Sequence, residues 1–283
     1  MSRALRLQKE LAQINTIEDL TQAFEGIASI HISHIRDRVV ASKEFFSELW
    51  PVYSSLRVDP KERLRRTNRE HKGRNVLVAV TGEGKLGTET AEKIIESMLA
   101  TYSPDKTDII TVGSRGETLL RSRGVIVVNN FAFPPGDMNI NIGSVIKELY
   151  KYDHISVFYQ TYESLRQQNV QRIDLISAVR ELGQDTGETS KAISSQDYIF
   201  EPNIDEIANY MESVMMGVAF IQIIMESKLA GYAARFNAMS RAKKRAADLA
   251  YDYKRQFYRS KRSESDERTK EIIKAAKIQE LRR

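Results

Sequence analysis

The sequence has no cysteine, one tryptophan and only six prolines among its 283 residues. Without cysteine the chain can form no disulfide, no thiolate metal site and no cysteine nucleophile. No apolar run approaches the roughly 20 residues of a membrane-spanning helix. The charged start, with Arg3, Arg6, Lys9 and Glu10, is unlike a targeting segment. The remaining composition, 41% hydrophobic and 29% charged, is typical of a helix-rich soluble chain, and its net charge of +5 favours an acidic partner.

The most regular pattern is a seven-residue repeat that starts at Ile204 and runs to about Phe257. Such a repeat without proline predicts a long helix packed along another helix. Continued to Leu281, the helix would be about 115 Å long, so it needs a partner helix or a sheath of other proteins. The first positions are Ile204, Met211, Val218, Met225, Tyr232, Met239, Ala246 and Tyr253, and the fourth are Ile207, Val214, Ile221, Lys228, Arg235, Ala242, Leu249 and Gln256.

A second helical pattern occupies the N-terminal part of the chain, from Ser2 to about Leu56. We expect Pro51 and the Asp59-Pro60 pair to close this helix. The basic segment that follows is interpreted as a surface linker. We expect the two terminal helices to pair antiparallel as a stalk. The apolar residues that step by threes and fours are Leu7, Leu11, Ile14, Phe24, Ala28, Ile32, Ile35 and Val39.

Between the two helices, short β-branched runs alternate with helical stretches, which predicts an α/β insert with a largely parallel sheet. The expected division is 1–56 for the N-terminal coiled-coil helix, 57–74 for the linker, 75–200 for a Rossmann-like α/β domain and 201–283 for the C-terminal coiled-coil helix. A loop is expected over 183–195. Strands are predicted at Asn75 to Val80, Asp108 to Val112, Val125 to Asn129, His154 to Tyr159 and Arg172 to Ser177, and helices at Glu89 to Ala100 and Ile142 to Tyr150.

One motif imitates a nucleotide site. Gly82, Gly84 and Gly87 follow an apolar strand with the spacing of the G-x-G-x-x-G dinucleotide fingerprint. The acidic residue expected at the end of the second strand is absent, and the lysine and serine or threonine of a P-loop are missing. A dinucleotide-dependent oxidoreductase stays open as an alternative, but glycine also serves tight turns that hold no ligand.

Other chemical groups carry less information. His31 and His34 lie three residues apart without a third metal ligand in reach, and His71 and His154 have no partnered nucleophile. The cationic run between Arg241 and Arg262 could suggest nucleic acid, yet such charges also form the solvated face of a coiled coil. A free-standing coiled-coil scaffold or nucleic-acid binder is therefore a further alternative.

Several motifs together resemble the gamma subunit of F-type rotary ATP synthases. Glu226-Ser227 followed by Ala233-Ala234-Arg235-Phe236-Asn237-Ala238-Met239 is similar to the family's E-S…A-A-R-M-x-A-M signature. Tyr198 to Asn203 resembles its Y-x-F-E-P-S entry to the last helix, and Val112 to Gly116 with Arg121 to Gly124 resembles its G-x-K-G and R-R-x-G pair. Asn15-Thr16 followed by Leu20 to Phe24 is similar to N-T-x-x-I-T-K-A-M.

The chain departs from the family in places. Thr81 to Thr88 stands where the family has S-D-x-G-L-C-G-G, Gly231 replaces a glutamate, and the helix between Tyr253 and Thr269 is longer by roughly two turns. These differences leave open a standard synthase or a specialised relative that works by hydrolysis.

The resemblance implies a central-stalk rotor without catalytic residues, cofactor or metal of its own, with ATP, ADP and magnesium on partner subunits. The implied partners are a ring of alternating alpha and beta subunits, an epsilon-type or mitochondrial delta-type stalk subunit and a membrane ring of c subunits, with one copy of this chain per complex and no nucleic acid. The implied place is the cytoplasmic face of a bacterial plasma membrane, or alternatively the matrix side of the mitochondrial inner membrane. The expected contacts with the ring are Phe24, Arg235, Met239, Arg241, Lys244, Arg245 and Thr269.

Overall fold

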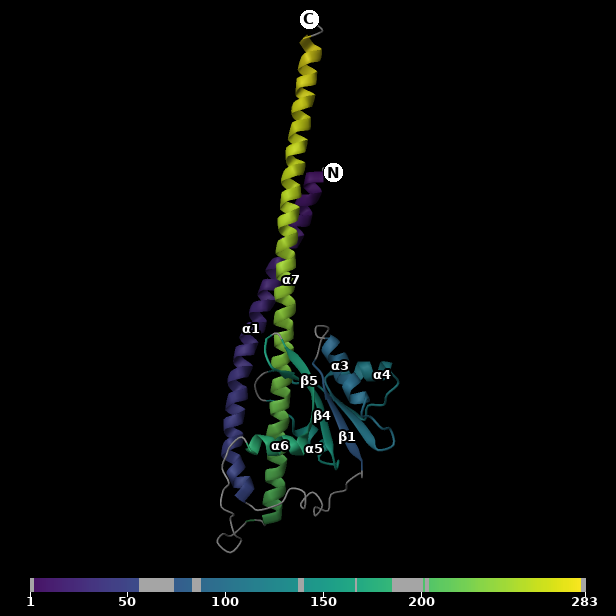
Figure 1. Ribbon diagram of the computed structural model, residues 1–283, viewed down its shortest axis with the longest axis vertical. Helices are drawn as coiled ribbons and strands as arrows, with labels where there is room; N and C mark the ends of the chain where they lie inside the picture. The colour runs from purple at the N-terminus through teal and green to yellow at the C-terminus, as the bar shows by residue number, and fades with distance from the viewer. Residues whose placement is uncertain are drawn as a thin grey trace. The chain divides into compact units, whose positions relative to one another are not determined.

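The computed structural model describes residues 3–55, 74–82, 88–136, 140–165, 167–184, 201 and 204–280. These residues form two compact units, which we name by their extents: the helical unit, residues 1–28 with 236–283, and the sheet unit, residues 29–235. Two long helices, α1 (Arg3–Ser55) and α7 (Ile204–Glu280), contribute to both units (Figure 1). The predicted start of the last helix at Ile204 is confirmed.

The sheet unit is built around a five-stranded sheet in the order β3-β2-β1-β4-β5. The first four strands in this order are parallel, and β5 runs antiparallel to β4. The predicted α/β insert with a largely parallel sheet is confirmed. Its strands are β1 (Asn75–Val80), β2 (Thr107–Val112), β3 (Asn129–Phe131), β4 (Ile155–Tyr162) and β5 (Gln168–Asp174), and its helices are α3 (Thr88–Leu99), α4 (Ser114–Ser122), α5 (Gly143–Leu149) and α6 (Leu175–Gln184).

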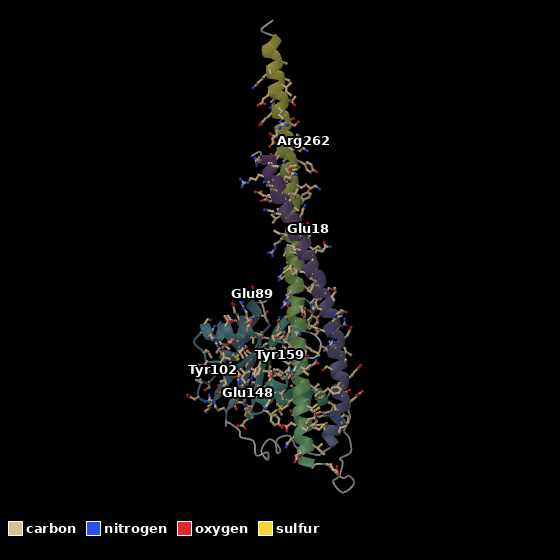
Figure 2. All side chains as sticks on the ribbon, turned by 180° about the vertical axis from the view of Figure 1, so that it is seen from behind. Glu18, Glu89, Tyr102, Glu148, Tyr159 and Arg262 are labelled. Carbon is tan, nitrogen blue, oxygen red and sulfur yellow. The ribbon has the colours of Figure 1, made fainter. Side chains whose placement is uncertain are left out.

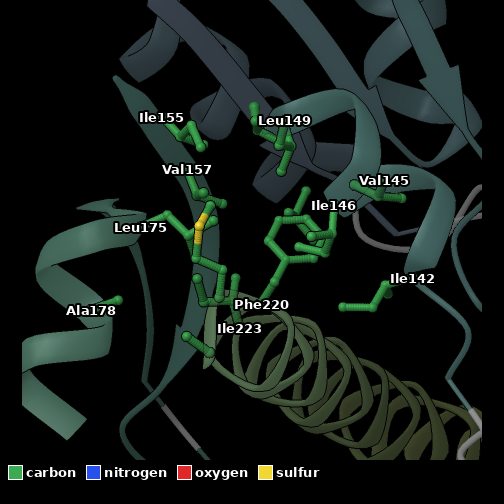
Figure 3. Packing of buried hydrophobic residues seen from close by; sticks show 14 of the residues in the cluster. Ile142, Val145, Ile146, Leu149, Ile155, Val157, Leu175, Ala178, Phe220 and Ile223 are labelled. Atoms are coloured by element: carbon green, nitrogen blue, oxygen red, sulfur yellow. The ribbon is translucent and has the colours of Figure 1, made fainter. Parts of the chain in front are cut away.

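Both faces of the central strands β1, β2 and β4 are buried, which explains their nearly continuous apolar runs. Leu77 and Ala79 of β1 pack against α3 and α4, while Val76, Val78 and Val80 point to the opposite core. That second core contains α5, α6 and the α7 segment Met215 to Ile224. Figure 3 shows α5 side chains facing those of α7 across this core. The start of α7 is therefore fixed by burial against the sheet.

Within the sheet unit, α1 and α7 touch at two levels. Phe46 of α1 is 2% exposed and belongs to the same core as Phe220 of α7. The ring of His31 stacks on Tyr232 with a centroid distance of 4.5 Å. The residue number rises along one helix as it falls along the other, so these helix segments run antiparallel.

The helical unit has the same antiparallel arrangement. The Ala4 backbone N–H donates to Glu264 Oε1 at 3.3 Å, and Lys243 Nζ lies 3.4 Å from Glu25 Oε2. The less exposed positions of α1 here recur every seven residues in two rows. These rows are Ala4, Leu11, Glu18 and Glu25, and Leu7, Ile14, Thr21 and Ala28.

On α7 the first row of the predicted repeat is confirmed, because Met239, Ala246 and Tyr253 are buried or half-buried. The predicted second row is wrong, because it is displaced by one residue from the row that faces α1. Leu249 is 50% exposed, and Gln256 is also exposed. A cation at the inner position 243 is tolerated because Glu25 pairs with it across the helices. The second row that faces α1 is Lys243, Ala250, Phe257 and Glu264.

Several predicted element boundaries are wrong. Pro51 lies inside α1 and does not end it. The strand expected at Val125 to Asn129 begins at Asn129, and the one expected at Arg172 to Ser177 ends at Asp174. Asp174 Oδ1 accepts the N–H groups of Ile176 and Ser177 at 3.1 Å, which caps the start of α6. Most of the predicted linker and of the 183–195 loop lies outside the described residues.

By length and composition, α7 could also cross a membrane. An 18-residue window within Asn209–Lys277 has a mean hydropathy of 1.4, which contradicts the expectation that no segment approaches a membrane span. However, 61% of that window is buried inside the protein, and the core helix of a soluble protein meets the same criteria. The apolar character of α7 is accounted for by its packing against the sheet.

Candidate interaction surface

Basic side chains cover much of the exposed surface of α7 in the helical unit. Between Arg241 and Arg262, nine Lys and Arg side chains and two Asp give a net charge of +7. Arg241, Lys244 and Arg245 are all exposed, and their spacing places them on one side of the helix. No carboxylate among the described residues pairs with these three cations. Figure 2 labels Arg262 at the end of this basic face. The face is suited to an acidic surface, which the described residues do not supply.

Phe24 lies on α1 outside the two rows that face α7, and it is 53% exposed. It belongs to an exposed apolar stripe, which also contains Ile17, Leu20 and Ile27 with exposures of 52%, 53% and 50%. Their spacing of three, four and three residues places them on one side of the helix. A contiguous exposed apolar row indicates a contact surface. The sequence interpretation missed the other three residues, since their spacing overlaps the inner pattern of the same helix.

Arg235 belongs to the sheet unit, where its guanidinium lies 5.2 Å from the ring centroid of Tyr232. The side chain is half-buried, and no described residue forms an ion pair with it. The cation is therefore held by an aromatic ring, and its charge is available to a partner. Met239 is half-buried on the inner row of α7 in the helical unit, so within this chain it packs toward α1.

Beyond Glu264, the contact that α7 makes with the start of α1 ends. Every described residue from Ser265 to Lys277 is exposed, including Ile272 at 69%. Thr269 lies in this segment, and its hydroxyl donates to the Ser265 carbonyl at 2.9 Å. Thr269 is thus accessible on a segment of α7 that contacts no other element among the described residues.

The glycine motif is described only at Gly82, which is exposed, and Gly84 and Gly87 lie outside the described residues. The adjoining turn is packed backbone to backbone: Gly113 has a φ of +111°, and a Cβ placed on it would lie 1.8 Å from the Thr81 carbonyl oxygen. The Gly116 N–H donates to Thr81 Oγ1 at 2.9 Å. One backbone donor at the start of α4 is therefore already satisfied by the protein.

The strongest electrostatic perturbation among the described residues lies at the other end of the sheet. Burial raises the pKa of Tyr152, and the hydrogen bond that its hydroxyl donates to Asp108 Oδ2 at 3.0 Å raises it further. Asp108 Oδ1 in turn pairs with Arg74 at 2.9 Å. This network joins β2 to the residue before β1 and to the turn before β4, so its role is structural.

Metal-ligand clusters are absent from the described ranges: no group of three His, Cys, Asp or Glu is placed to hold an ion. His31 stacks on Tyr232, while His34 and His154 are exposed. His71 lies outside the described residues.

Solved structures with a similar fold come from mitochondrial ATP synthases. The structure of the Euglena gracilis rotor matches with a TM-score of 0.58 at 12% identity, covering 92% of this chain and 98% of that chain. A second Euglena gracilis structure, of the OSCP/F1/c-ring assembly, matches with a TM-score of 0.61 at 14% identity, covering 95% and 92%. The fold is thus that of an ATP synthase rotor chain.

Comparison of sequences identifies the family within the proteins that share this fold. The model of the family described as ATP synthase matches residues 4–277. The ATP synthase gamma chain of Mycoplasmoides gallisepticum is 24% identical over 95% of this chain and 97% of its own length, and that of Cytophaga hutchinsonii is 21% identical over 95% and 96%. The chain belongs to the ATP synthase gamma-chain family, whose members form the rotor of the central stalk.

Proposed function

We propose that this chain is the rotor of an F-type ATP synthase, which couples nucleotide chemistry in a surrounding ring to ion translocation by a membrane ring. The observation that carries the proposal is the match to the gamma-chain family over residues 4–277. The long α7, 77 residues in one helix, gives the chain the stiff element that this work needs. An asymmetric shaft presents different contacts to each ring subunit as it turns, so it can bias their conformations in sequence.

The shaft in this proposal is an antiparallel coiled coil of α1 and α7. Its support is the alternation of inner positions by threes and fours on both helices and the two contacts Ala4 to Glu264 and Glu25 to Lys243. Beyond Glu264, α7 continues alone and exposed, and we propose that the ring encloses this part.

The contacts with the alternating alpha and beta subunits combine apolar and ionic groups. Phe24 supplies an exposed aromatic ring, and Thr269 lies on the exposed end of α7. We propose that acidic segments of the ring meet the basic face at Arg241, Lys244 and Arg245, three cations that no described carboxylate pairs with.

Two of the expected contacts are less accessible. Arg235 is half-buried over Tyr232, and we propose that it pairs with a ring carboxylate during part of each turn. Met239 packs toward α1, so it would reach a ring subunit only through its exposed portion.

The remaining parts of the proposal concern the assembly. One copy of the chain would contact an epsilon-type or mitochondrial delta-type stalk subunit and a ring of c subunits, and would carry no catalytic residue, cofactor or metal. The complex would lie peripherally on an energy-coupling membrane, on the cytoplasmic face of a bacterial plasma membrane or, alternatively, on the matrix side of the mitochondrial inner membrane.

A specialised hydrolytic motor is the second candidate within the same class. It stays open because the sequence departs from the family pattern, with Gly231 in place of a glutamate and a longer helix before Thr269. Both candidates share the rotor role and differ in the direction of work.

Co-expression of the chain with its own organism's alpha and beta subunits tests the proposal. We expect a stable complex that hydrolyses ATP, with a probe on this chain rotating relative to the immobilised ring. The purified chain alone should bind neither ATP nor NAD by calorimetry. Saturable micromolar binding of NAD, together with failure to assemble with the ring, would favour the oxidoreductase and defeat the rotor.

A further inference from the structure

The sheet unit contains a cavity of about 190 Å³ beside α7. Its walls come from Gly82 after β1, from the segment 133–135 after β3, and from the face of α7 between Ser227 and Arg235. The cavity therefore lies at the carboxyl end of the parallel strands, where open α/β sheets bind their ligands. This position marks it as a candidate site, but its chemistry must come from the side chains that line it.

The described lining carries two cations and no acid. Lys228 is only 5% exposed, and its ammonium donates to the Gly136 carbonyl oxygen and lies 5.7 Å from the centroid of the Phe133 ring. These contacts hold the ammonium at the wall of the cavity. Ser227, 7% exposed, adds a buried hydroxyl. A site with this lining favours an anion, because opposite charges attract more strongly at a protein surface than in bulk water.

Arg235 is the side chain in the cavity that can orient a bound ligand. Its guanidinium lies against the ring of Tyr232, whose ring in turn stacks on His31. A cation–π contact does not use the guanidinium N–H groups as donors to an oxygen, so the N–H edge keeps its donors for a planar pair of acceptors. No described residue accepts a hydrogen bond from this edge. Two parallel N–H groups match two oxygens of one oxyanion.

We propose that this cavity binds a small oxyanion such as inorganic phosphate, held by the Arg235 edge, the Lys228 ammonium and the Ser227 hydroxyl. The volume suffices for one tetrahedral oxyanion with a few waters, since a water molecule occupies about 30 Å³ of liquid. The inference does not rest on the proposed ring contact of Arg235. A bound oxyanion would, however, use the same N–H edge as a ring carboxylate, so the two would exclude each other.

The test is calorimetric titration of the purified full-length chain with inorganic phosphate at constant ionic strength, with chloride as the reference salt. We expect saturable binding at one site. Arg235→Gln and Lys228→Met should each weaken it at least about tenfold, which corresponds to about 1.4 kcal/mol. Arg255→Gln is the matched control, because Arg255 is exposed on α7 and outside the cavity. It should bind phosphate like the parent.

Folding of each variant is checked by circular dichroism and thermal melting, and Arg235→Gln alone suffices if Lys228→Met fails to fold. Phosphate heats no larger than those of chloride would overturn the proposal. Equal loss in Arg255→Gln would also overturn it, because binding would then follow general surface charge. Since no ring subunit is present, these outcomes are independent of whether the chain acts as a rotor.

Discussion

Phe24→Ala separates a contact with the ring from packing within the chain. Phe24 and Phe46 lie on the same helix, but Phe24 is 53% exposed and Phe46 is 2% exposed. A phenylalanine buries about 200 Å² when fully covered, so the exposed half of Phe24 offers roughly 100 Å² to a partner. At about 25 cal/mol per Å² this is worth up to about 2.5 kcal/mol, or somewhat less than a hundredfold in affinity.

We expect Phe24→Ala to leave the stability of the isolated chain almost unchanged. Phe24→Ala is expected to alter the free energy of unfolding by less than about 1 kcal/mol, because alanine favours the helix and the lost contacts are at the surface. The matched control, Phe46→Ala, removes a ring from the core it shares with Phe220 and should cost about 3–5 kcal/mol.

Denaturant unfolding of the isolated chain and titration of the chain onto purified alpha and beta subunits measure the two quantities. We expect Phe24→Ala to weaken assembly by tenfold or more, because the apolar area that Phe24 would bury against the ring is lost. The unfolding midpoint of the variant should stay close to that of the parent. Unchanged assembly would refute the ring contact. A loss of stability comparable to that of Phe46→Ala would show instead that Phe24 belongs to the core of the chain.

Three further perturbations test other parts of the structure. Arg235→Ala should lower the thermal stability of the isolated chain only slightly, because the lost interaction with Tyr232 is worth about 0.5–1 kcal/mol, while the ATPase of the assembled complex becomes less coupled to rotation; lost stability with unchanged activity would contradict this. Gly113→Ala should destabilise the sheet unit by several kcal/mol, since its Cβ would clash with the Thr81 carbonyl oxygen, and a melting temperature equal to that of the parent would refute the clash. Burial raises the folded-state pKa of Tyr152 above its unfolded value near 10, so stability should be intact below pH 10 and fall above it; Tyr152→Phe should show a smaller fall in alkaline denaturation melts, and an identical pH profile would defeat the assignment.

The sequence alone determined those elements in which a regular pattern of apolar residues directly reflects which sides are buried. β1 was predicted with its observed bounds because a strand buried on both faces leaves an unbroken apolar run. The long C-terminal helix was predicted because a seven-residue repeat without proline has few other interpretations. Sequence motifs also pointed to the gamma-chain family before any geometry was known.

The tertiary structure decided which of several compatible faces is covered. Ala242 and Leu249 fit the repeat as well as Lys243 does, but the ion pair with Glu25 and the position of α1 turn Lys243 inward and leave Leu249 exposed. Phe24 and Ala28 likewise continue one apolar pattern, yet only Ala28 faces α7.

Contacts between residues far apart in the sequence also decide where some elements begin or end. No local pattern in the sequence predicts these boundaries. α4 is absent from the sequence predictions, and its first turn is held by a distant contact: the Thr81 hydroxyl, 35 residues earlier in the chain, accepts the Gly116 N–H. The cavity beside Arg235 has the same origin, since its walls come from the ends of β1 and β3 and from α7. The two cations lie seven residues apart on α7, but the walls that surround them are far apart in sequence and meet only after folding.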